Sequence, residues 1–229
     1  FEHCRRIVEE AEQAEQLVQQ MQVEPSGLLR ISMPLAFGTN FMQALIQEFL
    51  NTYPKIDLEL EMDNRVIDIV DQEIDVAFRA SEVESSSLIA RPIGFGQLIV
   101  CATPEYIEKH GEPRHPSELE GHEIIRHPGV PLSMHAKNTE IPIPSRSRLL
   151  INDMSFIHKM TLGHQGIGII PAMLALTDIS DGKLKHLLQN YGFLRKQFYL
   201  VYASRQKSSK ISAFVDFVMA RVGEGSAWQ

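Results

Sequence analysis

The chain has 229 residues with a net charge of -7, and 44% of them are hydrophobic and 22% charged. This ordinary globular composition with an acidic balance argues against a nucleic-acid grip, which would show a basic patch or stripe. The two cysteines do not suggest a disulfide framework, no apolar run is long enough to span a membrane, and the charged start is unlike a signal peptide. We therefore expect a cytoplasmic protein without membrane association.

Residues 1–24 are predicted to form a charged helix with a narrow apolar seam. Apolar or small residues recur there at alternating steps of three and four, which is the heptad spacing of a coiled coil, over about three heptads. We expect this linker helix to dimerise with its copy in a second chain, although its small alanines would bury little area. The predicted dimerisation residues are Cys4, Ile7, Ala11, Ala14, Val18 and Met21.

A first α/β unit follows the stop signals Pro25 and Gly27. Strands and helices alternate along it, which is typical of a parallel sheet flanked by helices. One strand, 56–62, alternates apolar and acidic residues, as a strand with one solvated face does. The other predicted strands are 28–34, 74–79 and 88–93, and the predicted helices are 39–54 and 65–72.

Two similar apolar runs, 98–104 and 200–206, are predicted to be paired crossovers between two lobes, although common strand residues could match by chance. A second α/β unit lies between them, and an amphipathic helix at 210–222 returns to the first lobe. The predicted fold class is therefore α/β, with two lobes that each hold a mostly parallel sheet. We expect residues 25–97 and 203–225 to form lobe 1, and residues 98–202 to form lobe 2. The strands predicted in lobe 2 are 123–128, 148–153 and 166–171, and the predicted helix is 155–164.

A two-lobed α/β body predicts a ligand cleft at the carboxyl ends of the parallel strands. The turn PLAFGTN is the most informative of these ends, because Gly38 permits close approach and Thr39 or Asn40 could cap a helix. A helix N-terminus favours an anion such as a carboxylate, but an ordinary cap would show the same pattern. Arg79, at another strand end, could pair with a ligand carboxylate or with a neighbouring acidic side chain.

Catalytic and metal signatures are weak in this chain. Asp153, Ser155 and His158 lie close in sequence, but no glycine-flanked elbow would expose the serine. The histidines at 110, 115, 122 and 127 lack zinc-ligand spacing, and no phosphate-binding or dinucleotide loop occurs. We expect no catalytic residue, no metal and no cofactor.

Six stretches between residues 27 and 174 resemble LysR-type transcriptional regulators, in the order of that family. The run from Asp75 to Gly94 is the most specific of them. The stretches are GLLRISMPLAFG, FLNTYPKIDLEL, DVAFRASEVESSSLIARPIG, QLIVCATPEYIEKHG, HPSELEGHEII and GHQGIGIIPAML.

The resemblance implies a two-lobed effector domain of the type 2 periplasmic-binding-protein kind. It also implies a linker helix that pairs two subunits, dimers that commonly form tetramers, and a winged helix-turn-helix for promoter DNA before this chain's first residue. Effector contacts would come from turns at strand ends and from the start of the crossover. On this sequence they are Leu35, Phe37, Gly38, Thr39, Asn64, Arg79, Gln97, His127, Asn152 and Met154.

The leading hypothesis is thus the effector-sensing and oligomerising region of a bacterial transcription regulator. Its partners would be a small effector, carboxylate or aromatic, a second copy in a homodimer or homotetramer, and promoter DNA bound through the preceding domain. A solute-binding receptor would have the same cleft but not the heptad helix. An enzyme on the same scaffold would need a reactive group in the cleft.

Overall fold

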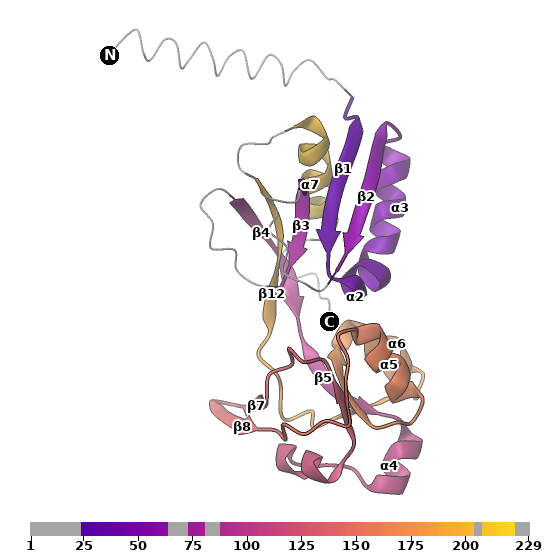
Figure 1. Cartoon of the computed structure of the whole chain (residues 1–229), viewed down its shortest axis with the longest axis vertical. Helices are drawn as coiled ribbons and strands as arrows, with labels where there is room; N and C mark the ends of the chain where they lie inside the picture. Colours follow the sequence, from indigo (N-terminus) through magenta and orange to yellow (C-terminus); the bar gives the residue numbers. More distant parts are fainter. Residues whose placement is uncertain (1–23, 64–72, 81–87, 204–207, 223–229) are drawn as a thin grey trace, which may run out of the picture.

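The computed structural model describes residues 24–63, 73–80, 88–203 and 208–222, arranged in two lobes joined by extended segments (Figure 1). The six predicted dimerisation residues and the predicted helix 65–72 lie outside these ranges. No helix within the described ranges is long and apolar enough to cross a membrane.

Lobe 1 contains a five-stranded sheet in the order β2-β1-β3-β12-β4. Strands β1, β2 and β3 are parallel, whereas β12 is antiparallel to β3 and β4. The four strands predicted for the first lobe are present, because runs of branched and aliphatic residues favour a buried pleated surface. The strands are β1 (Gly27–Met33), β2 (Ile56–Met62), β3 (Val76–Arg79), β4 (Leu88–Gly96) and β12 (Lys196–Ala203).

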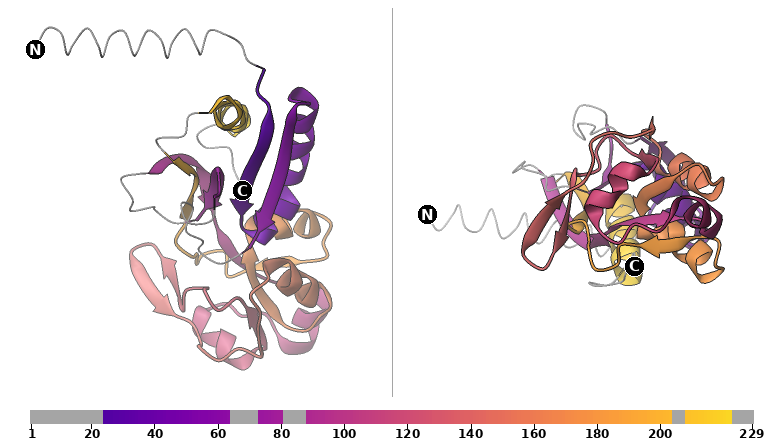
Figure 2. Two further views of the ribbon diagram at one scale, coloured as in Figure 1. Left: turned by 45° about the horizontal axis from the view of Figure 1, so that its top comes forward. Right: turned by 90° about the horizontal axis from the view of Figure 1, so that it is seen from below.

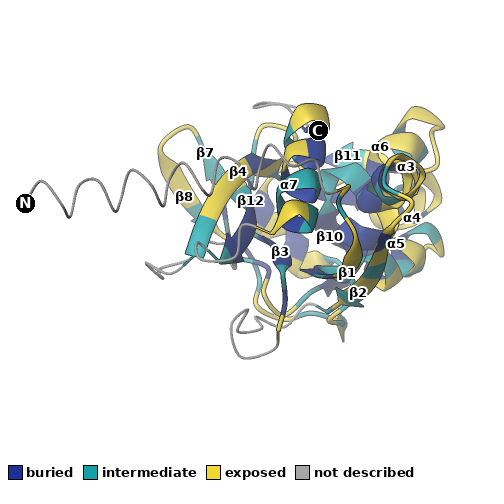
Figure 3. Ribbon diagram, turned by 90° about the horizontal axis from the view of Figure 1, so that it is seen from above, coloured by how far each residue is buried: buried dark blue, intermediate teal, exposed yellow. Residues whose placement is uncertain are grey.

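One face of this sheet is covered by α3 (Gln43–Thr52) and α7 (Ser209–Arg221), which pack side by side. Their contact is aromatic: Phe49 meets Phe214 edge-on at 4.9 Å and Phe217 at 5.1 Å between ring centroids. Figure 3 shows the buried strands beneath helices whose outer sides are exposed. Aromatic rings therefore join the two helices over an otherwise largely aliphatic core.

Lobe 2 contains a second five-stranded sheet in the order β11-β5-β10-β6-β9. Strands β6, β9 and β10 are parallel, and β5 and β11 run antiparallel to their neighbours. The predicted strands and helix of this lobe are confirmed in shortened form. They are β6 (Ile124–Arg126), β9 (Leu149–Leu150), β10 (Ile167–Pro171) and α5 (Met154–Leu162); the sheet is completed by β5 (Leu98–Ala102) and β11 (Lys185–Leu187).

Several elements of lobe 2 had no counterpart among our predictions. A hairpin of β7 (Ser133–Ala136) and β8 (Thr139–Pro142) projects from the lobe (Figure 1 and Figure 2). Each strand of this hairpin has only four residues, so its alternation of apolar and polar residues is hard to recognise in a polar stretch. The remaining elements are α4 (Pro104–His110), the 3-10 helix η2 (Pro116–Gly121) and α6 (Ala172–Ser180).

The chain passes between the two lobes twice. The first crossing lies at Gln97, between β4 and β5, whereas the second lies between β11 and β12 and ends before Lys196. Lobe 1 therefore resumes at the start of β12, and not at residue 203. The predicted crossover runs fall instead within strands over their described residues, because β5 belongs to the sheet of lobe 2 and β12 to that of lobe 1; both runs are apolar since both strands are buried.

Candidate functional site

The parallel strands of lobe 1 end together beside the helix that starts at Leu35. The main-chain N–H of Asp63, just after β2, donates to the carbonyl of Met33 at the end of β1, at 3.1 Å. Arg79, the last residue of β3, reaches Ser32 on β1 with a 3.0 Å hydrogen bond. The structure thus brings the predicted turn 35–39 and Arg79 to one edge of the sheet, as parallel strands require. Asn64 lies outside the described residues.

The helix at this edge begins earlier than predicted, so the capping role of Thr39 or Asn40 was wrong. It starts at Leu35 after Pro34 and runs as α2 (Leu35–Phe37), a π-helical turn η1 (Gly38–Met42) and α3. Thr39 Oγ1 donates to the carbonyl of Leu35 at 2.6 Å, and Asn40 Nδ2 donates to that of Ala36 at 2.8 Å. These are bonds back to the preceding turn, which polar side chains inside a helix make.

The π-helical turn is shaped by tight packing. A Cβ on Gly38 would lie 2.6 Å from Met62 Sδ and 2.9 Å from Met33 Sδ, so the helix approaches the two strands closely there. Phe37 is 4% exposed and stacks within 5.4 Å of Phe41 and Phe198. π-Helical turns are rare and are frequently found at functional sites.

Arg79 is buried, with 7% of its surface exposed. Its terminal nitrogens donate to the carbonyl of Phe78 at 2.9 Å and to the hydroxyl of Ser32 at 3.0 Å. Burial lowers the pKa of Arg79, and the nearby Glu61 carboxylate partly raises it again. In the part of the chain that the structure describes, the hydrogen bonds of the Arg79 side chain go to neutral oxygens, and the Glu61 carboxylate acts on its charge without forming an ion pair with it.

In lobe 2 the parallel strands β6 and β9 also end together. The N–H of Ile151 after β9 donates to the carbonyl of Arg126 at the end of β6, at 3.1 Å, so His127 and Asn152 follow adjacent strand ends. Asp153 caps α5 by accepting the N–H of Phe156 at 2.8 Å, and Met154 begins that helix. Asn152 is exposed, whereas Met154 packs partly against both apolar clusters of the lobe.

His127 is placed by its own turn. Its Nδ1 accepts the N–H of Gly129 at 2.8 Å, and burial, together with the charge of Lys196, lowers its pKa. The ring is thus favoured in the neutral form, with the proton on Nε2, where it can donate a hydrogen bond.

The strand ends of lobe 1 and of lobe 2 are linked by contacts near Gln97, where the chain first passes between the lobes. Gln97 accepts the N–H of Ala172, the first residue of α6, at 2.8 Å through its main-chain carbonyl. Ala36 of α2 belongs to an apolar cluster whose other buried members, such as Ile99 and Leu174, lie in lobe 2. The predicted turn 35–39 therefore lies where lobe 1 meets lobe 2.

The weak catalytic set does not assemble. Asp153 is occupied as a helix cap, and His158 Nε2 pairs with Asp178 on α6 at 2.8 Å. Ser155 Oγ is buried without a hydrogen-bond partner among the described residues, and so has no base beside it. Burial, reinforced by Asp178, raises the pKa of Cys101 to about 12, which leaves that thiol unreactive.

The histidines considered for zinc also have other roles. His115 accepts the N–H of Ser117, and His122 lies 3.4 Å from the hydroxyl of Tyr106, on whose ring His110 stacks. No three His, Cys, Asp or Glu residues converge as a metal site in the part of the chain that the structure describes.

Three site neighbours were missed from the sequence. Ser32 holds Arg79, Lys196 faces His127 with its charge, and Arg126 is a second buried arginine at a strand end. An arginine as the last residue of an apolar strand was a signal available for Arg126, which we had applied only to Arg79. The partners of both arginines depend on strand order, which the sequence does not state.

Comparisons with known proteins agree with this architecture. A family model described as the LysR substrate binding domain matches residues 22–223. An HTH-type transcriptional regulator of Xanthomonas campestris pv. campestris (strain 8004) is 32% identical over 232 residues, covering 96% of this chain and 67% of that protein. Its name is that of a regulator, and not of an enzyme.

Two solved structures show the same fold. The full-length Vibrio cholerae virulence activator AphB, described as a member of the LTTR protein family, matches with a TM-score of 0.82 at 26% identity, covering 97% of this chain and 78% of that one. The regulatory domain of CrgA, a LysR-type regulator from Neisseria meningitidis, matches with a TM-score of 0.78 at 26% identity, covering 87% and 100%. The predicted two-lobed α/β fold is thereby confirmed.

Proposed function

The chain belongs to the family of LysR substrate-binding domains, the effector-binding regulatory domains of LysR-type transcriptional regulators, and from this premise we propose that its effector is a small carboxylate held between the lobes. The proposed contacts are those predicted from the sequence, with Arg79 as the anchor in lobe 1. His127, Gln97 and Asn152 would complete the site from the crossing and from lobe 2.

The state of Arg79 is the observation that carries this proposal. A guanidinium has five N–H donors, and the described contacts of Arg79 use its two terminal nitrogens for neutral oxygens. Neutral oxygens balance a buried guanidinium only in part, so a carboxylate that pairs with it would form a stronger, charge-assisted hydrogen bond. An uncharged aromatic effector would form no charge-assisted bond with Arg79, which is why we favour a carboxylate.

The proposed mechanism follows from where the site lies. A ligand that contacts strand ends of both lobes binds one arrangement of the lobes better than another, and only this difference in affinity can shift their populations. In the proposed dimer or tetramer, that shift would change how paired helix-turn-helix domains, preceding this region, meet two half-sites on promoter DNA in the cytoplasm. Self-association would use the heptad helix predicted at residues 1–24.

The test uses calorimetry with benzoate and succinate as an aromatic and an aliphatic carboxylate probe. Arg79→Gln and Thr39→Val should each weaken binding, Arg79→Gln by about tenfold or more because a charged hydrogen bond is lost. Thr52→Val is the matched control, because Thr52 makes the same bond to the preceding turn, to Glu48 at 2.8 Å, at the far end of the helix. Unchanged affinity in Arg79→Gln would contradict the anchor.

Self-association is tested separately by deleting residues 1–24. Sedimentation should then show a smaller oligomer than the full chain gives at the same concentration. The same oligomer with and without these residues would mean that the main interface lies elsewhere.

A further inference from the structure

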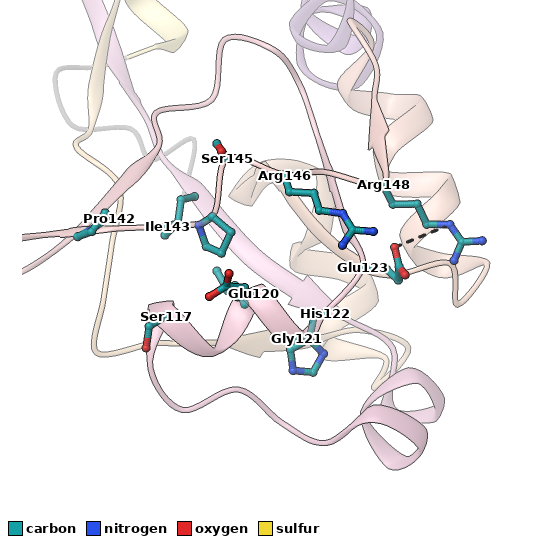
Figure 4. A pocket seen from close by; sticks show the side chains of 12 residues that line it. Ser117, Glu120, Gly121, His122, Glu123, Pro142, Ile143, Ser145, Arg146 and Arg148 are labelled. Carbon is teal, nitrogen blue, oxygen red and sulfur yellow. Dashed lines mark ion pairs between the residues drawn. The ribbon is translucent and has the colours of Figure 1, made fainter.

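A polar hollow of about 510 Å³ opens on lobe 2, within the size range of small-molecule sites (Figure 4). One wall is Ser117 and residues 119–123, from η2 and the turn after it, and the other is the loop 142–146 with Arg148. These walls precede β6 and β9, so the hollow lies at the amino ends of the parallel strands. His127 and Asn152 follow their carboxyl ends, and the hollow is therefore separate from the effector site proposed above.

We propose that this hollow is a second ligand site, which binds a small zwitterion of the free α-amino-acid class. The ligand carboxylate would pair with Arg146 on the loop, and the ligand ammonium with Glu120 on η2. The proposal does not depend on the identity of the effector between the lobes.

The loop wall is fixed by a buried arginine. Arg126, which is 6% exposed, donates from Nε to Ser147 Oγ at 2.7 Å and from a terminal nitrogen to the carbonyl of Ser145 at 3.0 Å. The N–H of Arg148 also donates to the carbonyl of Ile124 at 3.0 Å. Arg146 thus projects from a backbone that is held on both sides, which reduces the ordering that binding would require.

The opposite wall is equally well fixed. Leu119 is 1% exposed in the apolar core, and the side chain of His115 caps the start of η2 by accepting the N–H of Ser117. Because the Tyr106 hydroxyl accepts the N–H of Glu123 at 3.1 Å, its own proton can go to His122 Nδ1 at 3.4 Å. The His122 proton then lies on Nε2, which adds a neutral donor to the wall.

The charges of the two walls are complementary to a zwitterion. Within the described residues Arg146 and Glu120 make neither an ion pair nor a hydrogen bond, and Figure 4 shows them on opposite walls. The other two charges, on Arg148 and Glu123, already lie 4.0 Å apart. An anion alone would approach two carboxylates, and a cation alone two guanidinium groups, so a ligand carrying both charges is favoured.

The experiment follows backbone amide shifts of the full chain by NMR while the proteinogenic L-amino acids are added one at a time. At least one should shift residues 117–123 and 145–148 at concentrations up to the millimolar range. Its N-acetyl and carboxamide derivatives, each lacking one charge, should bind at least about tenfold more weakly.

Arg146→Gln and Glu120→Gln should each raise the dissociation constant by about tenfold. Arg114→Gln and Glu108→Gln are the controls, because both residues are exposed on the same lobe outside the hollow. The proposal is overturned if no amino acid shifts these residues, if shifts occur only around Arg79 and Thr39, or if one-charge derivatives bind as well as the parent compound.

Discussion

The two lobes have similar sheets but are stabilised by different side chains. Lobe 1 is packed with aromatic rings, of which Phe49, Phe78 and Phe214 are fully buried. Every histidine after His3 instead lies in lobe 2, between His110 and His186. We therefore expect changes of pH between 5 and 8 to affect lobe 2, which holds these histidines, more than lobe 1.

The buried arginines of the two lobes sharpen this contrast. Arg126 donates from Nε and both terminal nitrogens to the loop 145–148 and to the carbonyl of His127. These hydrogen bonds position the loop. Arg79 makes described bonds only through its terminal nitrogens. Similar positions at strand ends therefore lead to different contacts: Arg126 positions a loop, whereas Arg79 is the residue that we propose as the effector anchor.

The largest expected effect is in the aromatic core of lobe 1. Phe49→Ala should lower the free energy of unfolding by about 3–5 kcal/mol, because a fully buried ring is replaced by a cavity. Urea unfolding measures it, with Leu50→Ala, 39% exposed on the same helix, as the control. Equal losses in the two variants would show that the rings do not dominate lobe 1.

A glycine in each lobe tests how rigid the packing is. Gly168→Ala in lobe 2 would place Cβ 2.1 Å from Oγ1 of Thr161, which is fully buried and donates to Ile157, so we expect a loss of about 1–3 kcal/mol. Gly38→Ala should cost less, because flexible methionine side chains lie nearest and can move. Thermal unfolding that ranks Gly38→Ala as the more destabilising variant would reverse this comparison.

The smallest effect is the pH dependence of lobe 2. Burial lowers the pKa of His122, His127 and His186 below the ordinary value of 6.5. The unfolded chain therefore binds more protons than the folded one as pH falls below about 6.5, and stability that is complete above this value is progressively lost. As the pH falls towards 5, the hydrogen-exchange protection factors, corrected for the intrinsic rate at each pH, should decrease more in β5, β6 and β11 than in β1, and an equal decrease in both lobes would contradict this.

Much of the fold could be predicted because it depends on neighbours in sequence. The alternation of apolar and acidic residues in 56–62 predicted strand β2 with its exact bounds. The apolar helical faces of 39–54 and 210–222 predicted α3 and α7. The start of the first helix was misplaced because Thr39 and Asn40 are good capping residues, yet their side chains bond the carbonyls of Leu35 and Ala36 instead. Local propensity was overridden there by the packing of the helix on Met33 and Met62.

The candidate site was predictable as a set of strand ends, but not as a set of contacts. Arg79 was found from its place after an apolar strand, whereas its partner Ser32 is 47 residues away. The pairing of Arg126 with the loop 145–148 and the hollow beside it also needed strand order. Contacts between residues so far apart in the sequence form only when the sheet assembles.

By itself the sequence determined where strands and helices form, which family the chain resembles and which strand ends could face a ligand, because periodicity and local chemistry act over a few residues. Tertiary structure alone decided that β12 joins lobe 1, that Phe37 stacks in a core, and that Arg79 and Arg126 have different partners. The physical reason is that burial and hydrogen bonding between distant segments depend on sheet order and register, for which one sequence contains no short-range signal.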